Sequence, residues 1–253
     1  MASTNARGPS TPLVLIPGIQ GRWEFMRPTV AALRRSFDVL TFSLEGDSVE
    51  HGVEQVRRVL DAGHVDRAVI CGISFGGVVA LRFAADYPGR TQALVLVSTP
   101  GPDWHLSPQH ERYSRHPRLY GPLFLVQTPL RLRAEIARAI PSPLARLRFA
   151  LAQFATLLSA PLSCTRMAGR ARAVERSNRA EASARVTAPT LVVTGEPGLD
   201  HVVPVDGTSA YAHLIRGATY VTLPGTGHVG SITRPDEFAD LVHGFVQDQH
   251  AAA

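Results

Sequence analysis

The chain has 253 residues, of which 45% are hydrophobic and 19% charged, which fits one large globular domain and excludes a disordered chain. No apolar run reaches the roughly 18 residues needed to cross a membrane. The first residues hold one arginine and no apolar stretch, so no secretory leader is expected. Cys71 and Cys164 follow no ligand spacing and are expected to be free thiols, as in a cytoplasmic protein.

The positive charge is concentrated in one segment. All 26 basic residues are arginine, and the formal net charge is +5. Residues 101–188 hold 14 arginines against five acidic residues, whereas the rest of the chain holds 12 against 16. This surplus would either attract an anion (a carboxylate, a phosphate or an acyl carrier) or form solvated helix faces. No nucleic-acid recognition motif accompanies it, so we expect no nucleic-acid partner.

Short apolar runs alternate with helical patterns along the chain. Residues 12–18 form a run closed by proline and glycine, and a segment with helical spacing follows. Further strands are expected at 37–44, 67–74, 91–99, 189–196 and 218–225, with helices between them. Continuous apolar strands that alternate with helices predict an α/β fold, with a mostly parallel sheet and helices on both faces.

Residues 101–188 interrupt this alternation. They contain several prolines, no strand pattern, and apolar residues at helical spacing such as Leu144, Leu147 and Leu151. We therefore predict a helical insertion in a core formed by residues 1–100 and 189–253.

The stretch GISFGG, from Gly72 to Gly77, places one serine between glycines after a strand and before a helix. This context is typical of a tight strand-to-helix turn in which the serine takes a strained backbone conformation. The glycines remove side chains that would clash, and the hydroxyl of Ser74 projects beyond the carboxyl end of the sheet. The amides at the start of the helix can stabilise a developing oxyanion. Ser74 is therefore the candidate nucleophile.

A serine nucleophile needs a base and a group that orients the base. Among the histidines, His228 follows a strand within a glycine-rich loop, where it can reach the edge at which Ser74 projects. The loop after the preceding strand offers Glu196, Asp200 and Asp206 as the acid. We prefer Asp200, because Glu196 is too close to the strand end for its side chain to reach freely.

Together these segments resemble the α/β-hydrolase fold superfamily, in its serine-nucleophile branch with a helical cap between the family's sixth and seventh strands. The resemblance is carried in order by LVLIPG, CGISFGG, LVLVST, GEPGLDHVVP and PGTGH, and the order Ser74, Asp200, His228 is the family's order. It implies an oxyanion hole made of the backbone N–H groups of Ile19 and Phe75. The chain departs from the family in one respect: only about ten residues precede the first clear strand, so we expect the family's leading hairpin to be missing or reduced.

The resemblance implies acyl transfer through an acyl-enzyme, without a metal or organic cofactor. The leading expectation is a carboxylic ester hydrolase that acts on a small or medium ester, a lactone or a thioester. A carbon–carbon bond hydrolase, a perhydrolase or an acyltransferase would use the same residues, and a slow ligand-binding receptor of the same fold is a further alternative. The chain has no dinucleotide fingerprint and no phosphate-loop lysine.

The substrate is expected to be a small molecule, and the arginine surplus allows it to be anionic. Trp23 and Phe25, just after the oxyanion loop, are candidates for lining the cleft. Apolar residues of the insertion would either line the pocket or form the core of the cap: Leu123, Phe124, Leu125, Phe149, Phe154 and Leu157.

Overall fold

Six strands form one parallel sheet in the computed structural model, which describes residues 11–251. All six predicted strands are present, and their order across the sheet is β2-β1-β3-β4-β5-β6. Residues 1–10, on which the expectation of no leader and the start of the predicted core depend, lie outside the described residues. The strands are β1 (Thr11–Ile16), β2 (Phe37–Thr41), β3 (Ala68–Ile73), β4 (Thr91–Val97), β5 (Thr190–Thr194) and β6 (Thr219–Thr222).

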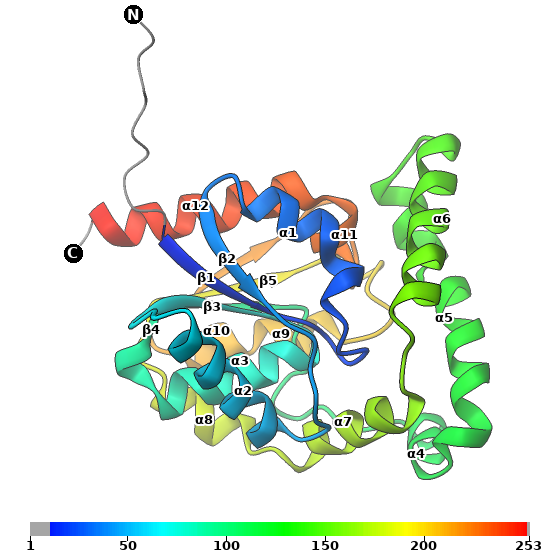
Figure 1. Cartoon of the computed structure of the whole chain (residues 1–253), viewed down its shortest axis with the longest axis horizontal. Coiled ribbons are helices and arrows are strands. Elements are labelled where there is room, and N and C mark those ends of the chain that lie inside the picture. The colour runs from blue at the N-terminus through cyan, green and yellow to red at the C-terminus, as the bar shows by residue number, and fades with distance from the viewer. Residues whose placement is uncertain (1–10, 252–253) are drawn as a thin grey trace, which may run out of the picture.

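Helices cover both faces of the sheet because successive strand side chains point into two separate apolar cores. In β3, for example, Ile70 belongs to one core and Cys71, a free thiol, to the other. The first face carries α2 (Val49–Ala62), α3 (Phe75–Asp86), α8 (Arg179–Arg185) and α10 (Tyr211–Leu214). The second carries α1 (Arg27–Leu33), α11 (Gly230–Thr233) and α12 (Pro235–Ala251) (Figure 1). This arrangement confirms the predicted α/β fold.

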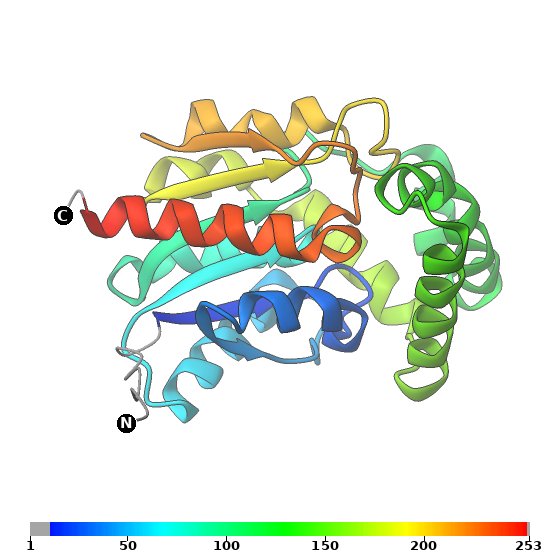
Figure 2. The ribbon, with the colours of Figure 1, turned by 90° about the horizontal axis from the view of Figure 1, so that it is seen from above.

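Residues between β4 and β5 form the predicted helical insertion. Its helices before α8 are α4 (Pro108–Arg115), α5 (Pro117–Ala139), α6 (Pro143–Ser159) and α7 (Cys164–Arg176). The strand arrows point toward the side of the molecule where α5 and α6 stand (Figure 2). The insertion therefore stands at the edge where a parallel sheet places its ligands. The division into a core (1–100 and 189–253) and a cap (101–188) stays a prediction.

Prolines and serines explain where the insertion helices begin. Ser107, Ser142 and Ser163 precede α4, α6 and α7, and each hydroxyl accepts a hydrogen bond from the amide three residues ahead. A proline follows the first two of these serines at the first helical position, where its missing N–H is not needed. Pro108, Pro117 and Pro143 therefore start helices, whereas Pro122 and Pro129 lie inside α5.

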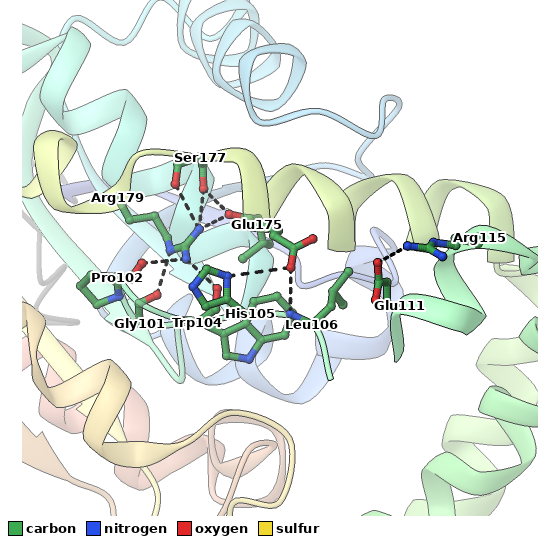
Figure 3. Close-up of polar contacts among 11 residues, drawn as sticks. Gly101, Pro102, Trp104, His105, Leu106, Glu111, Arg115, Glu175, Ser177 and Arg179 are labelled. Atoms are coloured by element: carbon green, nitrogen blue, oxygen red, sulfur yellow. Dashed lines mark hydrogen bonds and ion pairs between the residues drawn. The ribbon is translucent and has the colours of Figure 1, made fainter. Parts of the chain in front are cut away.

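Arg179 joins the two ends of the insertion. Its buried guanidinium donates to the carbonyl oxygens of Gly101, Pro102 and Trp104 at 2.8, 2.9 and 3.0 Å, and also to those of Val174 and Ser177 (Figure 3). The first three carbonyls follow β4, and the other two end α7. One arginine thus holds the segment that enters the insertion against the segment that leaves it.

One apolar stripe on each of α5 and α6 points to solvent. Six apolar residues of the insertion are expected from the sequence to line the pocket or to form the core of the cap, and this expectation is wrong for Leu123 and Phe154. They are 44% and 59% exposed. Opposite faces of the same helices carry the packed residues, which leaves these stripes without a neighbour. We call the stripes the outer face; they comprise Leu119, Leu123, Val126, Leu130, Leu144, Leu147, Leu151, Phe154 and Leu158.

Within residues 11–251, no individual helix combines the length and apolar character needed to cross a bilayer. The helices α6 and α7 meet that test only as a pair, with a bend of 103° between them.

Candidate active site

Ser74 occupies a strained turn between β3 and α3. Its backbone angles are φ 55° and ψ −117°, in a region that residues with a side chain rarely adopt. Two hydrogen bonds hold this turn: the amide of Ser74 donates to the carbonyl of Val97 at 2.8 Å, and the amide of Gly77 donates to the carbonyl of Ser74 at 2.9 Å. The predicted strained serine turn is present.

Three glycines make this turn sterically feasible. A Cβ at Gly72 would lie 2.1 Å from the carbonyl oxygen of Gly76, and one at Gly76 would lie 2.3 Å from that of Ile16. A Cβ at Gly77 would lie 1.9 Å from Oγ1 of Thr99. Because two of these obstacles are backbone atoms that cannot move aside, the turn requires glycine.

The loop after β1 lies beside the serine. A Cβ built on Gly18 would be 3.5 Å from the Cβ of Ser74. Ile19 follows directly, and the amide of Gly21 closes the turn by donating to the carbonyl of Gly18 at 2.9 Å. Phe75, buried with 1% exposure, is the first residue of α3. Phe75 therefore directly follows Ser74, and Ile19 belongs to the loop whose Gly18 lies beside the serine; their role as an oxyanion hole stays a prediction.

His228 and Asp200 are in contact. The ring Nδ1 of His228 lies 3.3 Å from Oδ2 of Asp200, and the other carboxylate oxygen accepts hydrogen bonds from the amides of Val202 and Val203, both at 2.9 Å. The alternative acid Glu196 is engaged elsewhere, since its Oε1 accepts a hydrogen bond from the amide of Gly225 at 2.8 Å. The loop after β5 thus orients Asp200 toward the histidine.

The two groups stabilise each other's charged form. Burial opposes ionisation of Asp200, but the charge and hydrogen bond of His228, together with the two loop amides, outweigh it and lower the pKa of this carboxyl. Burial likewise opposes protonation of His228, but Asp200, and more weakly Glu135, outweigh it and raise the pKa of the imidazole. A histidine in this setting can hold a proton taken from a nucleophile.

Two residues of the insertion reach this region, and the sequence reasoning missed both. Arg170, only 2% exposed, donates to the carbonyl oxygens of Ile19, Leu44 and Gly46, each at 2.9 Å, so it fixes the loop after β1. Glu135 accepts a hydrogen bond from the residue after His228. A signal for Glu135 was present, because it is the only acidic residue between positions 112 and 174.

Arg170 also shows what part of the arginine surplus does. Burial and the neighbouring Arg166 lower the pKa of Arg170 to about 10, so the guanidinium remains charged at neutral pH. Like Arg179, it uses its fork of donors on backbone carbonyls. These two arginines are therefore structural and are not available to an anionic substrate.

The predicted cleft residues lie between the sheet core and the insertion. Trp23 and Phe25 belong to the short helix η1 (Trp23–Met26), and both are half-buried. The side-chain nitrogen of Gln153, on α6, lies 3.5 Å from the carbonyl oxygen of Phe25. Across the described residues, no group of three or more His, Cys, Asp or Glu could hold a metal ion.

Comparison with known proteins assigns the family. The sequence profile of the alpha/beta hydrolase family matches residues 13–241. The chain belongs to the alpha/beta hydrolase family. As an alpha/beta hydrolase, it has relatives that are named as hydrolytic enzymes, and it is itself an enzyme of this class.

Two curated relatives and one solved structure illustrate the similarity. This alpha/beta hydrolase is 28% identical over 241 residues to pyrrolizixenacetamide deacetylase of Xenorhabdus hominickii, covering 92% of this chain and 84% of that protein. It is also 28% identical over 269 residues to 2-hydroxymuconate semialdehyde hydrolase of Pseudomonas sp. CF600, covering 97% and 90%. The enol-lactonase of Burkholderia xenovorans LB400 shares its fold, with a TM-score of 0.76, 22% identity, and coverage of 95% and 92%.

Proposed function

We propose that this protein is a serine hydrolase that cleaves a small or medium carboxylic ester, a lactone or a thioester through an acyl-enzyme. Ser74 would be the nucleophile, His228 the general base and Asp200 the group that orients it. The observation that carries the proposal is the contact of His228 with Asp200, at the sheet edge where the strained turn holds Ser74. No other buried serine of the described residues follows a strand in a GxSxG turn.

In this mechanism the hydroxyl oxygen of Ser74 attacks the substrate carbonyl carbon while His228 takes the hydroxyl proton. The backbone N–H groups of Ile19 and Phe75 would stabilise the oxyanion, and Asp200 would stabilise the imidazolium. His228 then returns the proton to the leaving alcohol, which leaves the acyl group on Ser74. Water, activated by the same histidine, releases the acid and restores the free serine.

The substrate would bind between η1 and the insertion, with Trp23 and Phe25 against its apolar part. The deacetylase and enol-lactonase names of two similar proteins support an acyl substrate of modest size. We also propose that the substrate has an anionic group, which would be bound by arginines other than Arg170 and Arg179.

A carbon–carbon bond hydrolase is the second candidate, because 2-hydroxymuconate semialdehyde hydrolase matches nearly the whole chain. Both reactions would use Ser74 and His228. Turnover of simple esters distinguishes the two candidates, because an ester hydrolase turns such esters over steadily.

The experiment is turnover of nitrophenyl esters of increasing acyl length by the wild type, Ser74→Ala and Ser183→Ala. Ser183 is a matched control because it is a buried serine on α8, where its hydroxyl bonds within its own helix. We expect steady turnover that only Ser74→Ala abolishes, and the acyl-length optimum would size the pocket. Undiminished turnover by Ser74→Ala would refute the assignment.

A further inference from the structure

Glu135 is the acidic residue that the insertion places in the loop carrying His228. It lies near the end of α5, its side chain is buried, and its Oε2 accepts a hydrogen bond from the amide of Val229 at 3.0 Å. On the other side of the histidine, a Cβ at Gly227 would lie 2.5 Å from the same oxygen. The carboxyl therefore fits against the backbone of both neighbours of His228.

The second oxygen of this carboxyl, Oε1, is buried and has no hydrogen-bond partner within the described part of the chain. A buried polar atom without a partner destabilises the fold, and a charged one does so more. If the side chain served only to accept the hydrogen bond of Val229, glutamine would supply the same acceptor without the buried charge. The carboxyl at Glu135 therefore points to a role for its charge.

The charged groups that face this carboxyl are the proposed catalytic ones. Burial is the largest effect and raises the pKa of Glu135 to about 7; the nearby charge of Asp200 adds to the rise, whereas the amide of Val229 and the charge of His228 oppose it. In return, Glu135 helps to raise the pKa of His228. Glu135 thus changes its charge in the pH range in which a histidine base works.

Three cations on α5 and on elements packed against it have other partners. Arg131, one turn earlier on α5, lies 3.2 Å from Nε2 of His110 on α4. Arg172 of α7 donates to a backbone carbonyl of α4. Arg234, at the end of α11, donates to Glu237 at 2.8 Å. Within residues 11–251, none of these three cations forms a hydrogen bond or an ion pair with the Glu135 carboxyl.

We propose that Glu135 is a positioning residue that fixes the His228 loop to the insertion and supports the imidazolium that forms when the base takes the proton of Ser74. The proposal rests on the proposed role of His228. It makes the base depend on the insertion: full support exists only while α5 holds its carboxyl against the loop.

The test compares Glu135→Gln, Glu135→Ala and the wild type, with Glu111→Gln as the matched control. Glu111 is an exposed acid on α4 that pairs with Arg115. The first readout is the titration of the His228 ring by proton NMR, assigned with His228→Ala, which needs no substrate. The second is the pH dependence of labelling of Ser74 by a fluorophosphonate.

We expect Glu135→Gln to keep the bond to Val229 and to lower the midpoint of the His228 titration by about 0.5 to 1 pH unit, since a neighbouring negative charge is removed. Labelling of Ser74 above that midpoint should fall only about two- to threefold, because the resting histidine is already neutral there but is a somewhat weaker base. Glu135→Ala should lower the midpoint similarly and slow labelling about tenfold through loss of the loop anchor. Glu111→Gln should change neither.

An unchanged His228 midpoint in Glu135→Gln would overturn the inference, and this isosteric variant keeps the test valid if Glu135→Ala does not fold. A different result would show that the proposed function, and not the role of Glu135, is wrong. In that case the wild-type ring of His228 titrates and responds to Glu135→Gln, but Ser74 is not labelled at any pH.

The outer face carries a second, independent inference. Eleven large apolar side chains are exposed among the described residues, and all except Leu214 and Tyr220 belong to this face. On both helices the members recur at alternating intervals of three and four residues, which aligns them along one side. Figure 2 shows α5 and α6 as the layer farthest from the sheet. Soluble monomers rarely expose so many large apolar side chains together.

The positive charge of α5 and α6 favours an anionic partner for the outer face. Residues 117–159 contain six arginines and a single acid, the buried Glu135. Exposed arginines flank the stripes, at Arg118, Arg133, Arg138 and Arg148. Association of two copies through this face would bring like charges together, whereas an anionic surface would be attracted to it. Apolar side chains with flanking arginines are also the combination found in helices that lie in a membrane interface.

We infer that the outer face docks on a lipid surface that carries anionic headgroups, with the leucines entering the acyl boundary and the arginines contacting phosphates. The test is co-sedimentation with vesicles of phosphatidylcholine alone or of equal parts phosphatidylcholine and phosphatidylglycerol. The variant is Leu147→Glu with Leu151→Glu, and the control is Leu214→Glu, at an exposed leucine on α10.

Binding should require phosphatidylglycerol, weaken with added salt, and fall about tenfold or more in the double variant, because two apolar contacts are lost and two negative charges are added. Leu214→Glu should bind like the wild type. Absence of binding to the mixed vesicles would overturn the inference. So would a concentration-dependent dimer in sedimentation velocity that the double variant abolishes, since a second copy would then be the occupant.

Discussion

Replacing Arg179 by alanine should destabilise the whole fold, because this side chain joins the two ends of the insertion. The guanidinium donates to the carbonyl oxygens of Gly101, Pro102 and Trp104 at 2.8, 2.9 and 3.0 Å. A hydrogen bond from a charged donor contributes about 1.5–3 kcal/mol, so these three bonds alone contribute about 4.5–9 kcal/mol before the cost of burial. Burial of the guanidinium, which also lowers the pKa of Arg179, offsets part of this gain. We expect a loss of about 3–5 kcal/mol in the free energy of unfolding.

Urea denaturation followed by circular dichroism measures this loss, and Arg115→Ala is its matched control. Arg115 pairs with Glu111 on the surface of α4 (Figure 3), with 67% of its side chain exposed, so its removal should change the free energy by less than about 0.5 kcal/mol. Arg179→Lys should recover less than half of the loss, because one ammonium cannot reproduce the fork of donors. Equal, small effects of Arg179→Ala and Arg115→Ala would refute this reasoning.

Three further predictions concern the site. Gly76→Ala should destabilise the protein by about 3 kcal/mol or prevent folding, because the new Cβ would lie 2.3 Å from a backbone oxygen. Gly89→Ala is the control: no atom lies within 4 Å of its new Cβ, so the free energy of unfolding should change by less than about 1 kcal/mol. Thermal unfolding compares the two variants. Asp200→Asn should lower kcat for esters about a thousandfold or more while the circular dichroism spectrum stays unchanged, and a loss below tenfold would argue against its orienting role. The kcat/KM of ester hydrolysis should fall as pH drops below the pKa of His228, which its partner raises above the ordinary value of 6.5; a flat acid limb in folded protein would exclude a histidine base.

The sheet and the serine turn could be predicted from sequence because their signals are local. Most strands contain a continuous apolar run, and the glycines around Ser74 form a pattern within six consecutive residues, although two of the atoms that require glycine there belong to Ile16 and Thr99. The preference for Asp200 over Glu196 rested on loop length alone, and the contact with His228 agrees with it.

The insertion was harder to predict because its key contacts join distant segments. Arg170 bonds to carbonyls more than 120 residues earlier in the chain, and Glu135 meets a loop 94 residues later. The periodicity of apolar residues along the chain does not predict such contacts between distant segments. The spacing of apolar residues that includes Leu151 correctly predicted a helix. This spacing alone does not show whether the apolar side of the helix faces the core or solvent.

In the proposed reaction, Ser74 carries the acyl group of an acyl-enzyme that forms with the help of His228. Reaction of the wild type with a nitrophenyl ester in a rapid-quench experiment, followed by peptide mass spectrometry, tests this step directly. We expect one acyl group per chain, located on Ser74, that disappears with turnover and never forms in Ser74→Ala. An acyl group on another residue, or ester turnover that persists in Ser74→Ala, would contradict the proposed reaction.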